Sequence, residues 1–127
     1  MLTLRIYSDV HQELRDDHSL FNIEVSGNEK EQILILAGDI DQIKNFATHQ
    51  ERKIWIKDLA KRFSSVLYVF GNHEYYRGKI GDAYTLKNRD IFNDIENMHI
   101  LSRDTPSVVI QGIKFVGASL WTPLKEV

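Results

Sequence analysis

The sequence predicts an α/β fold built around a parallel sheet, and three observations support that prediction. Residues 2–8 form a β-rich run, and residues 32–37 and 66–70 are almost continuously apolar. Runs that are apolar on both faces are typical of parallel strands covered on both sides. Residues 43–63 carry apolar side chains at mostly helical spacing, so they predict a βαβ unit with the strands on either side. A length of 127 residues fits a single domain, residues 1–127.

The rest of the chain predicts shorter elements. The helix of the βαβ unit is expected to break near residues 49–50, and residues 12–31 form a long polar loop or a weak helix. Residues 85–97 place apolar side chains near one face and predict a further helix. Residues 99–101 predict a short strand, and residues 107–116 predict a hairpin with a glycine in its tight turn.

The composition excludes several classes of protein. Sixteen Lys and Arg residues against eighteen Asp and Glu residues give a net charge of −2, so a strongly basic nucleic-acid-binding surface is absent. No stretch approaches the ~20 apolar residues of a membrane span, and the amino-terminal residues lack the features of a signal peptide. We therefore expect a cytoplasmic protein without a membrane partner. The absence of cysteine excludes disulfides and zinc-thiolate sites.

Polar side chains that can bind metals follow each of the three predicted strands. Asp9 and His11 follow the first strand, Asp39 follows the second, and Asn72 and His73 follow the third. In open α/β sheets, ligands bind beyond the carboxyl ends of the strands. If the three strands are neighbours, these side chains converge in one small volume.

The residue types at these strand ends suit a site for two divalent ions. Carboxylate, amide and imidazole ligands without sulfur favour Mn, Fe, Zn, Ni or Co. Two ions roughly 3.5–4 Å apart can activate a bridging water and hold a phosphate. Gly38 and Gly71, which precede Asp39 and Asn72, allow the backbone to turn sharply or to approach the ions closely. His73 is a natural proton donor, since an imidazole titrates near pH ~6.5.

Three motifs in this order resemble the calcineurin-like metallophosphoesterases. They are Asp9-x-His11, then Gly38-Asp39, then Gly71-Asn72-His73-Glu74, and the similarity extends across nearly the whole chain. The resemblance implies a four-layer α/β/β/α sandwich, here incomplete, with a mixed and largely parallel sheet. It also implies two divalent metal ions and the hydrolysis of a phosphate monoester or diester by a hydroxide that bridges them.

The resemblance also implies a role for each motif residue. Asp9 and His11 would bind the first ion, Asp39 would bridge both ions, and Asn72 would bind the second. The catalytic residues would be His73 as the acid and Glu74, which orients His73 or its loop. Three nearby residues are candidates for contact with the phosphoester substrate, although they equally suit a solvated loop with aromatic packing: Tyr75, Tyr76 and Arg77.

The sequence departs from the family pattern at two places. The family often has Gly-Asp-x-x-Asp, and Gln42 stands at the last of these positions. The family pattern also continues with a lone His and a Gly-His-x-His block, and no such residues follow Trp121. We therefore expect residues 1–127 to be the amino-terminal portion of the domain, and His18, His49 and His99 to be solvated or locally bonded rather than replacement ligands.

These departures leave two functions open. The first is a metal-dependent phosphoesterase, with the question open whether this chain is active or is impaired or inactive. The second is a non-catalytic remnant that folds or dimerises and binds at most one weak metal ion. A homodimer through an exposed sheet edge would fit either function. A nucleotide-binding module ranks lower, because no G-x-x-x-x-G-K-[ST] or G-x-G-x-x-G motif is present.

Overall fold

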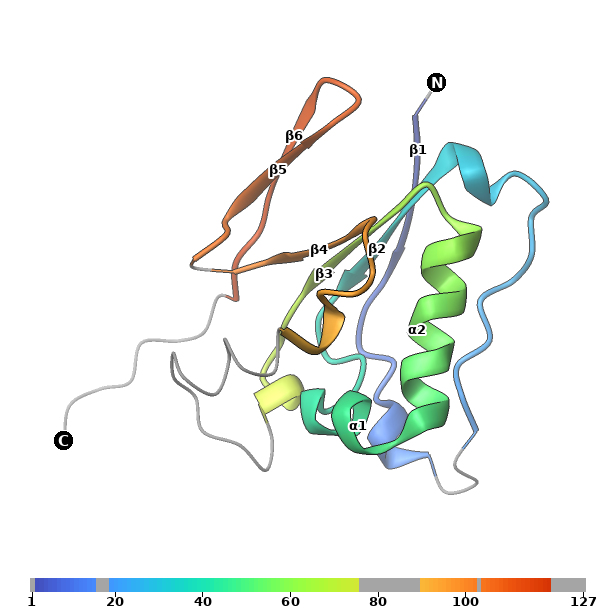
Figure 1. Ribbon diagram of the computed structural model, residues 1–127, viewed down its shortest axis with the longest axis vertical. Helices are drawn as coiled ribbons and strands as arrows, with labels where there is room; N and C mark the ends of the chain where they lie inside the picture. Colours follow the sequence, from blue (N-terminus) through green and yellow to red (C-terminus); the bar gives the residue numbers. More distant parts are fainter. Residues whose placement is uncertain (1, 16–18, 76–89, 103, 120–127) are drawn as a thin grey trace, which may run out of the picture.

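The predicted α/β fold is confirmed in a computed structural model of the chain (Figure 1). The structure describes residues 2–15, 19–75, 90–102 and 104–119. Its centre is a four-stranded sheet in which every neighbouring pair of strands is parallel and the strand order follows the chain. The four strands are β1 (Thr3–Tyr7), β2 (Gln32–Ala37), β3 (Ser65–Val69) and β4 (Met98–Leu101).

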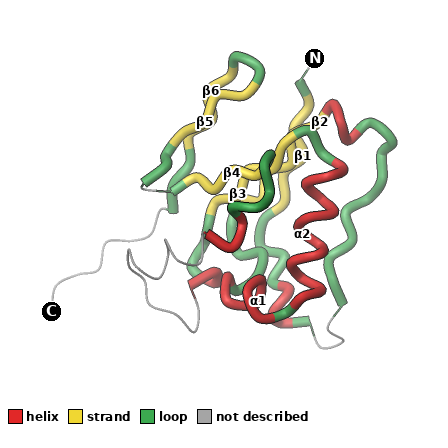
Figure 2. The backbone as a smooth tube through the Cα atoms, viewed as in Figure 1, coloured by secondary structure: helices red, strands yellow, loops and turns green. Residues whose placement is uncertain are grey.

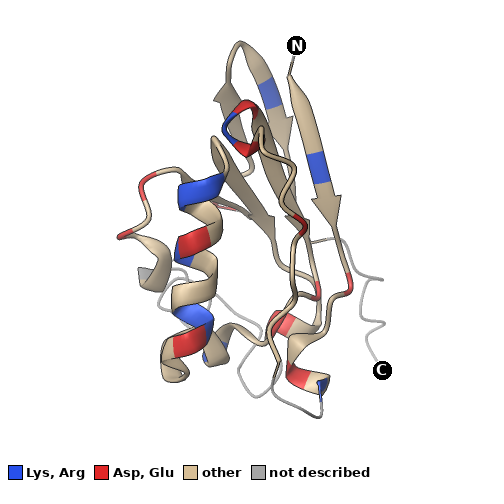
Figure 3. Cartoon of the chain, turned by 90° about the vertical axis from the view of Figure 1, so that its right-hand side faces the viewer, with Lys and Arg blue, Asp and Glu red and all other residues tan. Residues whose placement is uncertain are grey.

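Two helices connect β2 to β3 and cover one face of the sheet (Figures 1 and 2). The first is α1 (Ile43–Thr48) and the second is α2 (Gln50–Arg62). His49 separates them with extended backbone angles, φ −115° and ψ 106°, so the predicted break is confirmed. Charged residues of both signs lie along α2 (Figure 3), while Ile56 and Leu59 of the same helix are buried. This is the pattern of a helix that buries one side and leaves the other in water.

The hydrophobic core lies between the sheet and α2. Leu34 and Leu36 of β2 and Tyr68 of β3 are almost fully buried, and they belong to the same apolar cluster as Ile56 and Leu59 of α2. Each fully buried side chain of this size stabilises the fold by roughly 1.5–3 kcal/mol. The core therefore fixes the strands in the register that brings their carboxyl ends together.

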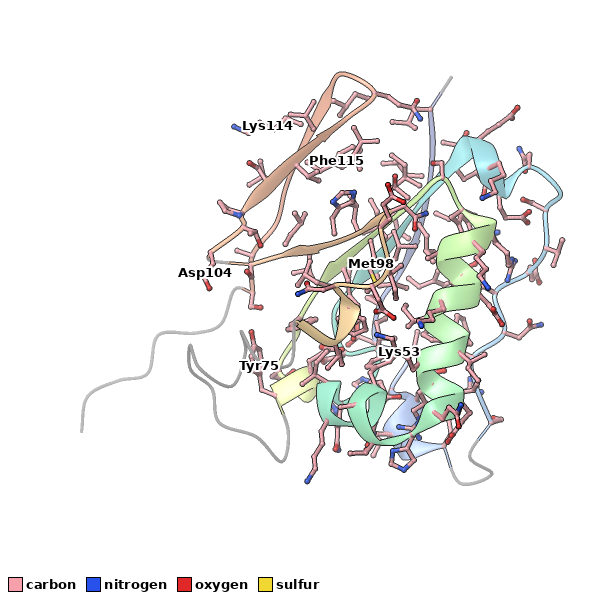
Figure 4. All side chains as sticks on the ribbon, in the orientation of Figure 1. Lys53, Tyr75, Met98, Asp104, Lys114 and Phe115 are labelled. Atoms are coloured by element: carbon pink, nitrogen blue, oxygen red, sulfur yellow. The ribbon has the colours of Figure 1, made fainter. Side chains whose placement is uncertain are left out.

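The predicted helix over residues 85–97 is wrong in its described part. Residues 85–89 lie outside the described residues, and the next residues form only a short 3₁₀ turn, η4 (Asp90–Phe92). Tertiary contacts explain the difference, because they override the helical spacing. Phe92 is buried in the core, and the amide of Asn97 donates to the carbonyl of Ala60 at 2.7 Å. Lys53 points from α2 toward this segment (Figure 4), with its Nζ 2.9 Å from Asp94.

The predicted hairpin is confirmed and forms a separate two-stranded antiparallel sheet. Its strands are β5 (Ser107–Ile110) and β6 (Ile113–Val116). Gln111 and Gly112 form the turn with φ of 52° and 77°, and two successive positive values are typical of a tight hairpin turn. The hairpin extends beyond β4, on the other side of the sheet from α2 (Figure 1). Phe115 lies between the hairpin and the sheet (Figure 4).

The sheet face opposite the helices is only partly covered. Leu4 and Ile6 of β1 are 42% and 60% exposed. Apolar surface of this kind is where a second copy of the chain would pack, so the homodimer stays a prediction. Among the described residues, no helix is long and apolar enough to cross a membrane.

Candidate metal centre

The three strand ends meet because β1, β2 and β3 are parallel neighbours. Backbone hydrogen bonds continue beyond the strands: Asp9 N–H donates to Gly38 O at 3.0 Å, and His11 N–H donates to Asp39 O at 2.9 Å. Asp9, His11 and Asp39 all have positive φ, of 56°, 51° and 55°. This conformation costs a non-glycine residue of order 1 kcal/mol and persists only where the surrounding structure enforces it. Three such residues in adjacent loops make this edge of the sheet the candidate functional site.

Gly38 and Gly71 permit the close approach of the second and third loops. Gly38 has a φ of 88°, and a Cβ atom there would lie 3.1 Å from the backbone nitrogen of Gly71. A Cβ atom on Gly71 would lie 2.9 Å from Cγ of Asp39 and would overlap the carboxylate. The sharp turn predicted for these glycines is therefore confirmed at Gly38, while the close approach of the backbone to metal ions stays a prediction.

A histidine, a carboxylate and a second histidine form the centre of the site. Ligand atoms of His11, Asp39 and His73 lie within 4.8 Å of one another. The two imidazole rings are 4.3 Å apart between centroids, and the backbone N–H of His73 donates to Oδ1 of Asp39 at 2.9 Å. Nitrogen and oxygen ligands at this spacing suit a first-row divalent ion. The structure thus brings His73, predicted as the proton donor, into the same cluster as the predicted metal ligands.

Polar atoms around this cluster fit a cation. The Asn72 side chain places one terminal atom of its amide 3.1 Å from each oxygen of Asp39. If no metal is bound, this terminal atom is best taken as the amide nitrogen, which can donate to both oxygens of Asp39. If it is instead the amide oxygen, a cation is needed between Asn72 and Asp39, because all the facing atoms are then acceptors. Nδ1 of His11 and Oε2 of Glu13 are buried and make no hydrogen bond. Because buried polar atoms are normally satisfied, their environment fits a bound metal.

Asp9 lies at the rim of the cluster. Its carboxylate is 67% exposed and has Oδ1 3.7 Å from Nε2 of His11. A carboxylate in this position can reach an ion held by His11 without being buried itself. The four predicted metal ligands, Asp9, His11, Asp39 and Asn72, therefore lie around one small volume.

Glu74 lies beneath the site and is fully buried. Its Oε1 accepts from the backbone N–H groups of Asp39 at 2.7 Å and Gly71 at 2.6 Å. Its Oε2 accepts from the backbone N–H of Ile40 at 2.7 Å and from the Tyr68 hydroxyl at 2.8 Å. Burial raises the pKa of Glu74, while these hydrogen bonds act in the opposite direction. These bonds join the second and third loops, so of its two predicted roles the geometry supports orientation of the loop.

Asp41 has a structural role that the sequence did not reveal. Its carboxylate is fully buried and accepts from Arg52 of α2 and from Asn45 of α1, at 2.8 and 2.7 Å. Burial raises the pKa of Asp41, and the contacts with Asn45 and Arg52 partly offset that effect. Gln12 also donates to Asp41, at 3.3 Å, which connects the first loop to the helices. The only signal in the sequence is that an acidic residue just before a helix is typical of a helix start, and this signal does not indicate the contact with Arg52.

Glu13 is the residue near the centre that sequence reasoning missed. It belongs to the short 3₁₀ turn η1 (Gln12–Leu14), and its Oε1 is 2.5 Å from Nδ1 of His73. The same oxygen is 3.6 Å from Nδ1 of His11. Its place two residues after His11, within a polar segment, was the only signal available.

The other candidate residues lie outside the centre or outside the described residues. Tyr75 packs its ring edge-on against Phe70, with centroids 6.0 Å apart, and Tyr76 and Arg77 lie outside the described residues. His49 is exposed near the surface of the helices, and His99 lies on β4, where burial lowers its pKa. The described histidines that approach the strand-end loops are therefore His11 and His73.

Comparison with protein families agrees with this geometry. The family model for calcineurin-like phosphoesterase matches residues 2–119, which includes all three strand-end loops. The chain belongs to the calcineurin-like phosphoesterase family. Comparisons with curated proteins and with solved structures found no match.

Proposed function

We propose that this chain is a metal-dependent phosphoesterase that hydrolyses phosphate monoesters or diesters at the edge of the parallel sheet. The observation that carries the proposal is the convergence of His11, Asp39 and His73 within 4.8 Å, built from three separate strand ends. Family membership supports a metal-dependent phosphoesterase in general terms.

Four side chains would hold the metal ions in this proposal. Asp9 and His11 would bind one ion, Asn72 would bind another, and Asp39 would bridge the two, with Mn, Fe, Zn, Ni or Co as suitable metals. When bound, such ions polarise a phosphoryl oxygen and lower the pKa of a coordinated water to about 7.

The remaining residues position these groups and move a proton. Glu74 holds the second and third loops together through the backbone of Asp39 and Gly71. His73 would donate a proton to the oxygen of the leaving group, since its ring lies at the centre of the cluster. A general acid of this kind typically contributes 10²- to 10⁴-fold in rate.

A phosphatase assay tests the proposal. With Mn²⁺ present, we expect hydrolysis of p-nitrophenyl phosphate or of its bis ester, and a loss of roughly 10²-fold or more in the Asp39→Asn and His73→Ala variants. His49→Gln, a change at an exposed histidine, should keep the wild-type rate. A wild-type rate no higher than that of Asp39→Asn would remove the claim of activity.

A calorimetric titration with Mn²⁺ separates this proposal from the non-catalytic alternative. Two tight sites per chain, both weakened in Asp39→Asn, support a two-metal phosphoesterase. At most one weak site, together with no hydrolysis, supports a remnant of the family that folds without catalysing the reaction.

A further inference from the structure

We propose that Glu13 is the positioning residue for His73. Its carboxylate holds the imidazole in one orientation and in one tautomer, with the proton on Nδ1, so that Nε2 faces the reaction. The proposal rests on the phosphoesterase function proposed above, because it assigns the atom of His73 that transfers the proton.

The contact between Glu13 and His73 is short and shielded from water. Oε1 of Glu13 lies 2.5 Å from Nδ1 of His73, and the two side chains are 4% and 18% exposed. Hydrogen bonds to a charged group are shorter and stronger than neutral ones. The two residues are 60 positions apart in the sequence, so the fold creates this pair.

The turn that carries Glu13 is itself held in place. The backbone N–H of Gln12 donates to Ile40 O at 2.9 Å, and the N–H of Leu14 donates to His11 O at 3.0 Å. The Gln12 side chain is fully buried and accepts from the Phe21 N–H at 2.8 Å. Since the residues on both sides of Glu13 are held by hydrogen bonds, the backbone keeps its carboxylate beside the His73 ring.

The chemistry of a carboxylate determines the tautomer. An ionised carboxylate only accepts hydrogen bonds, so Nδ1 of His73 must carry the proton in this contact. In a neutral imidazole the other nitrogen then has no proton, and it gains one when the ring is protonated. A histidine whose Nδ1 is held by a carboxylate thus presents Nε2 for proton transfer.

The same arrangement gives a balanced proton transfer. The oxygen of a water molecule forms a bond to phosphorus, and the bond from phosphorus to the leaving oxygen breaks with its electron pair going to that oxygen. The proton on Nε2 of His73 moves to the leaving oxygen, while Nδ1 keeps its proton toward Glu13. The water loses a proton to solvent, and solvent later restores the proton on Nε2.

Nitrogen NMR of the histidine side chains tests the tautomer without any metal or substrate. In the full chain at about pH 8, where an ordinary imidazole is neutral, we expect His73 to carry its proton on Nδ1. Glu13→Gln keeps the size of the side chain but can also offer an amide N–H, so the preference for Nδ1–H should be lost. Glu31→Gln, the same change on an exposed glutamate of a similar short turn, should leave the His73 signals unchanged. An unchanged tautomer in Glu13→Gln would overturn the proposal whether or not the protein is active.

A comparison of leaving groups separates positioning from general damage to the site. Proton donation matters most for a poor leaving group, so Glu13→Gln should lower kcat for phenyl phosphate by roughly 10²-fold. For p-nitrophenyl phosphate, whose leaving group needs little protonation, the loss should stay below about 10-fold. Glu13→Ala should behave in the same way, and Glu13→Gln decides the question if the alanine variant does not fold. Equal losses for both substrates would contradict a positioning role, whereas a wild-type protein that lacks activity but keeps the Nδ1–H tautomer would contradict only the proposed function.

Discussion

Glu74 and Asp41 lie beneath the candidate metal centre, where burial raises the pKa of both carboxyl groups. Glu29 and Asp94 lie away from the centre, and their pKa values are lowered to about 2. For Glu29 the largest cause is the hydrogen bond from the backbone N–H of Ser26. For Asp94 the causes are hydrogen bonds from Lys57 and then Lys53. The protein therefore places carboxylates in two opposite environments, and only one of them is beneath the site.

The difference shows what the buried carboxylates do. A buried charge is costly, and it persists where hydrogen bonds satisfy all of its oxygen atoms. Glu74 accepts hydrogen bonds from the backbone of two loops. Asp41 accepts hydrogen bonds from the side chains of Arg52, Asn45 and Gln12. Their function is to hold loops whose backbone is strained, whereas Asp94 forms ion pairs with Lys53 and Lys57 near the surface.

Loss of Glu74 is expected to have the largest effect. Glu74→Ala leaves the N–H groups of Asp39, Ile40 and Gly71 without their buried acceptor, and should lower the free energy of unfolding by about 5 kcal/mol. Urea denaturation measures this change. Glu74→Gln keeps one acceptor oxygen and should lose less. A loss below about 1 kcal/mol in the alanine variant would mean that the loops hold their shape without this carboxylate.

The second largest effect is expected from breaking a buried ion pair, which should lower the free energy of unfolding more than breaking an exposed one. Arg52→Met leaves the buried Asp41 carboxylate without its cation and should lower the free energy of unfolding by about 3 kcal/mol. Lys53→Met removes one of the two cations beside Asp94, whose side chain is 52% exposed, and should cost less than about 1 kcal/mol. The two variants are compared by urea denaturation at the same pH. Similar losses in both would break the comparison between buried and exposed carboxylates.

The pH dependence gives the smallest effect, and its sign differs between the two environments. Asp94 has a pKa lowered from 3.8 to about 2, so its contribution to stability is present above 3.8 and is lost as the pH falls through about 2. The urea midpoint of Asp94→Asn should therefore lie below that of the wild type at about pH 5, and the difference should shrink as the pH falls toward about 2. The raised pKa of Glu74 has the opposite sign, because its contribution is present below 4.5 and is lost as the pH rises through the folded value. A midpoint difference for Asp94→Asn that grows on acidification would contradict this assignment.

Much of the fold could be predicted from the sequence, since its signals are local. The runs at 32–37 and 107–116 become β2 and the β5–β6 hairpin with the expected limits. The positions of Asp9, Asp39 and Asn72 followed from the rule that parallel strands end at one edge. The helical spacing of apolar residues gave a wrong prediction where tertiary contacts determine the structure. Residues 90–97 pack against the core and α2 as turns rather than as a helix.

The residues that support the centre could not be predicted in the same way. Glu13 contacts His73 across 60 positions, and Asp41 contacts Arg52 across 11. No local pattern records such a pair, because a single acidic residue in a polar segment usually faces solvent. Only the fold, which brings the first loop beneath the third, shows that these carboxylates are buried.

Paramagnetic broadening by Mn²⁺ tests the central claim most directly. The claim is that the three strand ends form one metal centre around His11, Asp39 and His73. When Mn²⁺ is added below one equivalent, the NMR signals of the His11 and His73 side chains should broaden first, while those of His49 and His99 persist. The Asp39→Asn variant should need far more Mn²⁺ for the same broadening. If His49 and His99 broaden together with His11 and His73, or if Asp39→Asn responds like the wild type, the strand ends do not form the metal centre described for this protein.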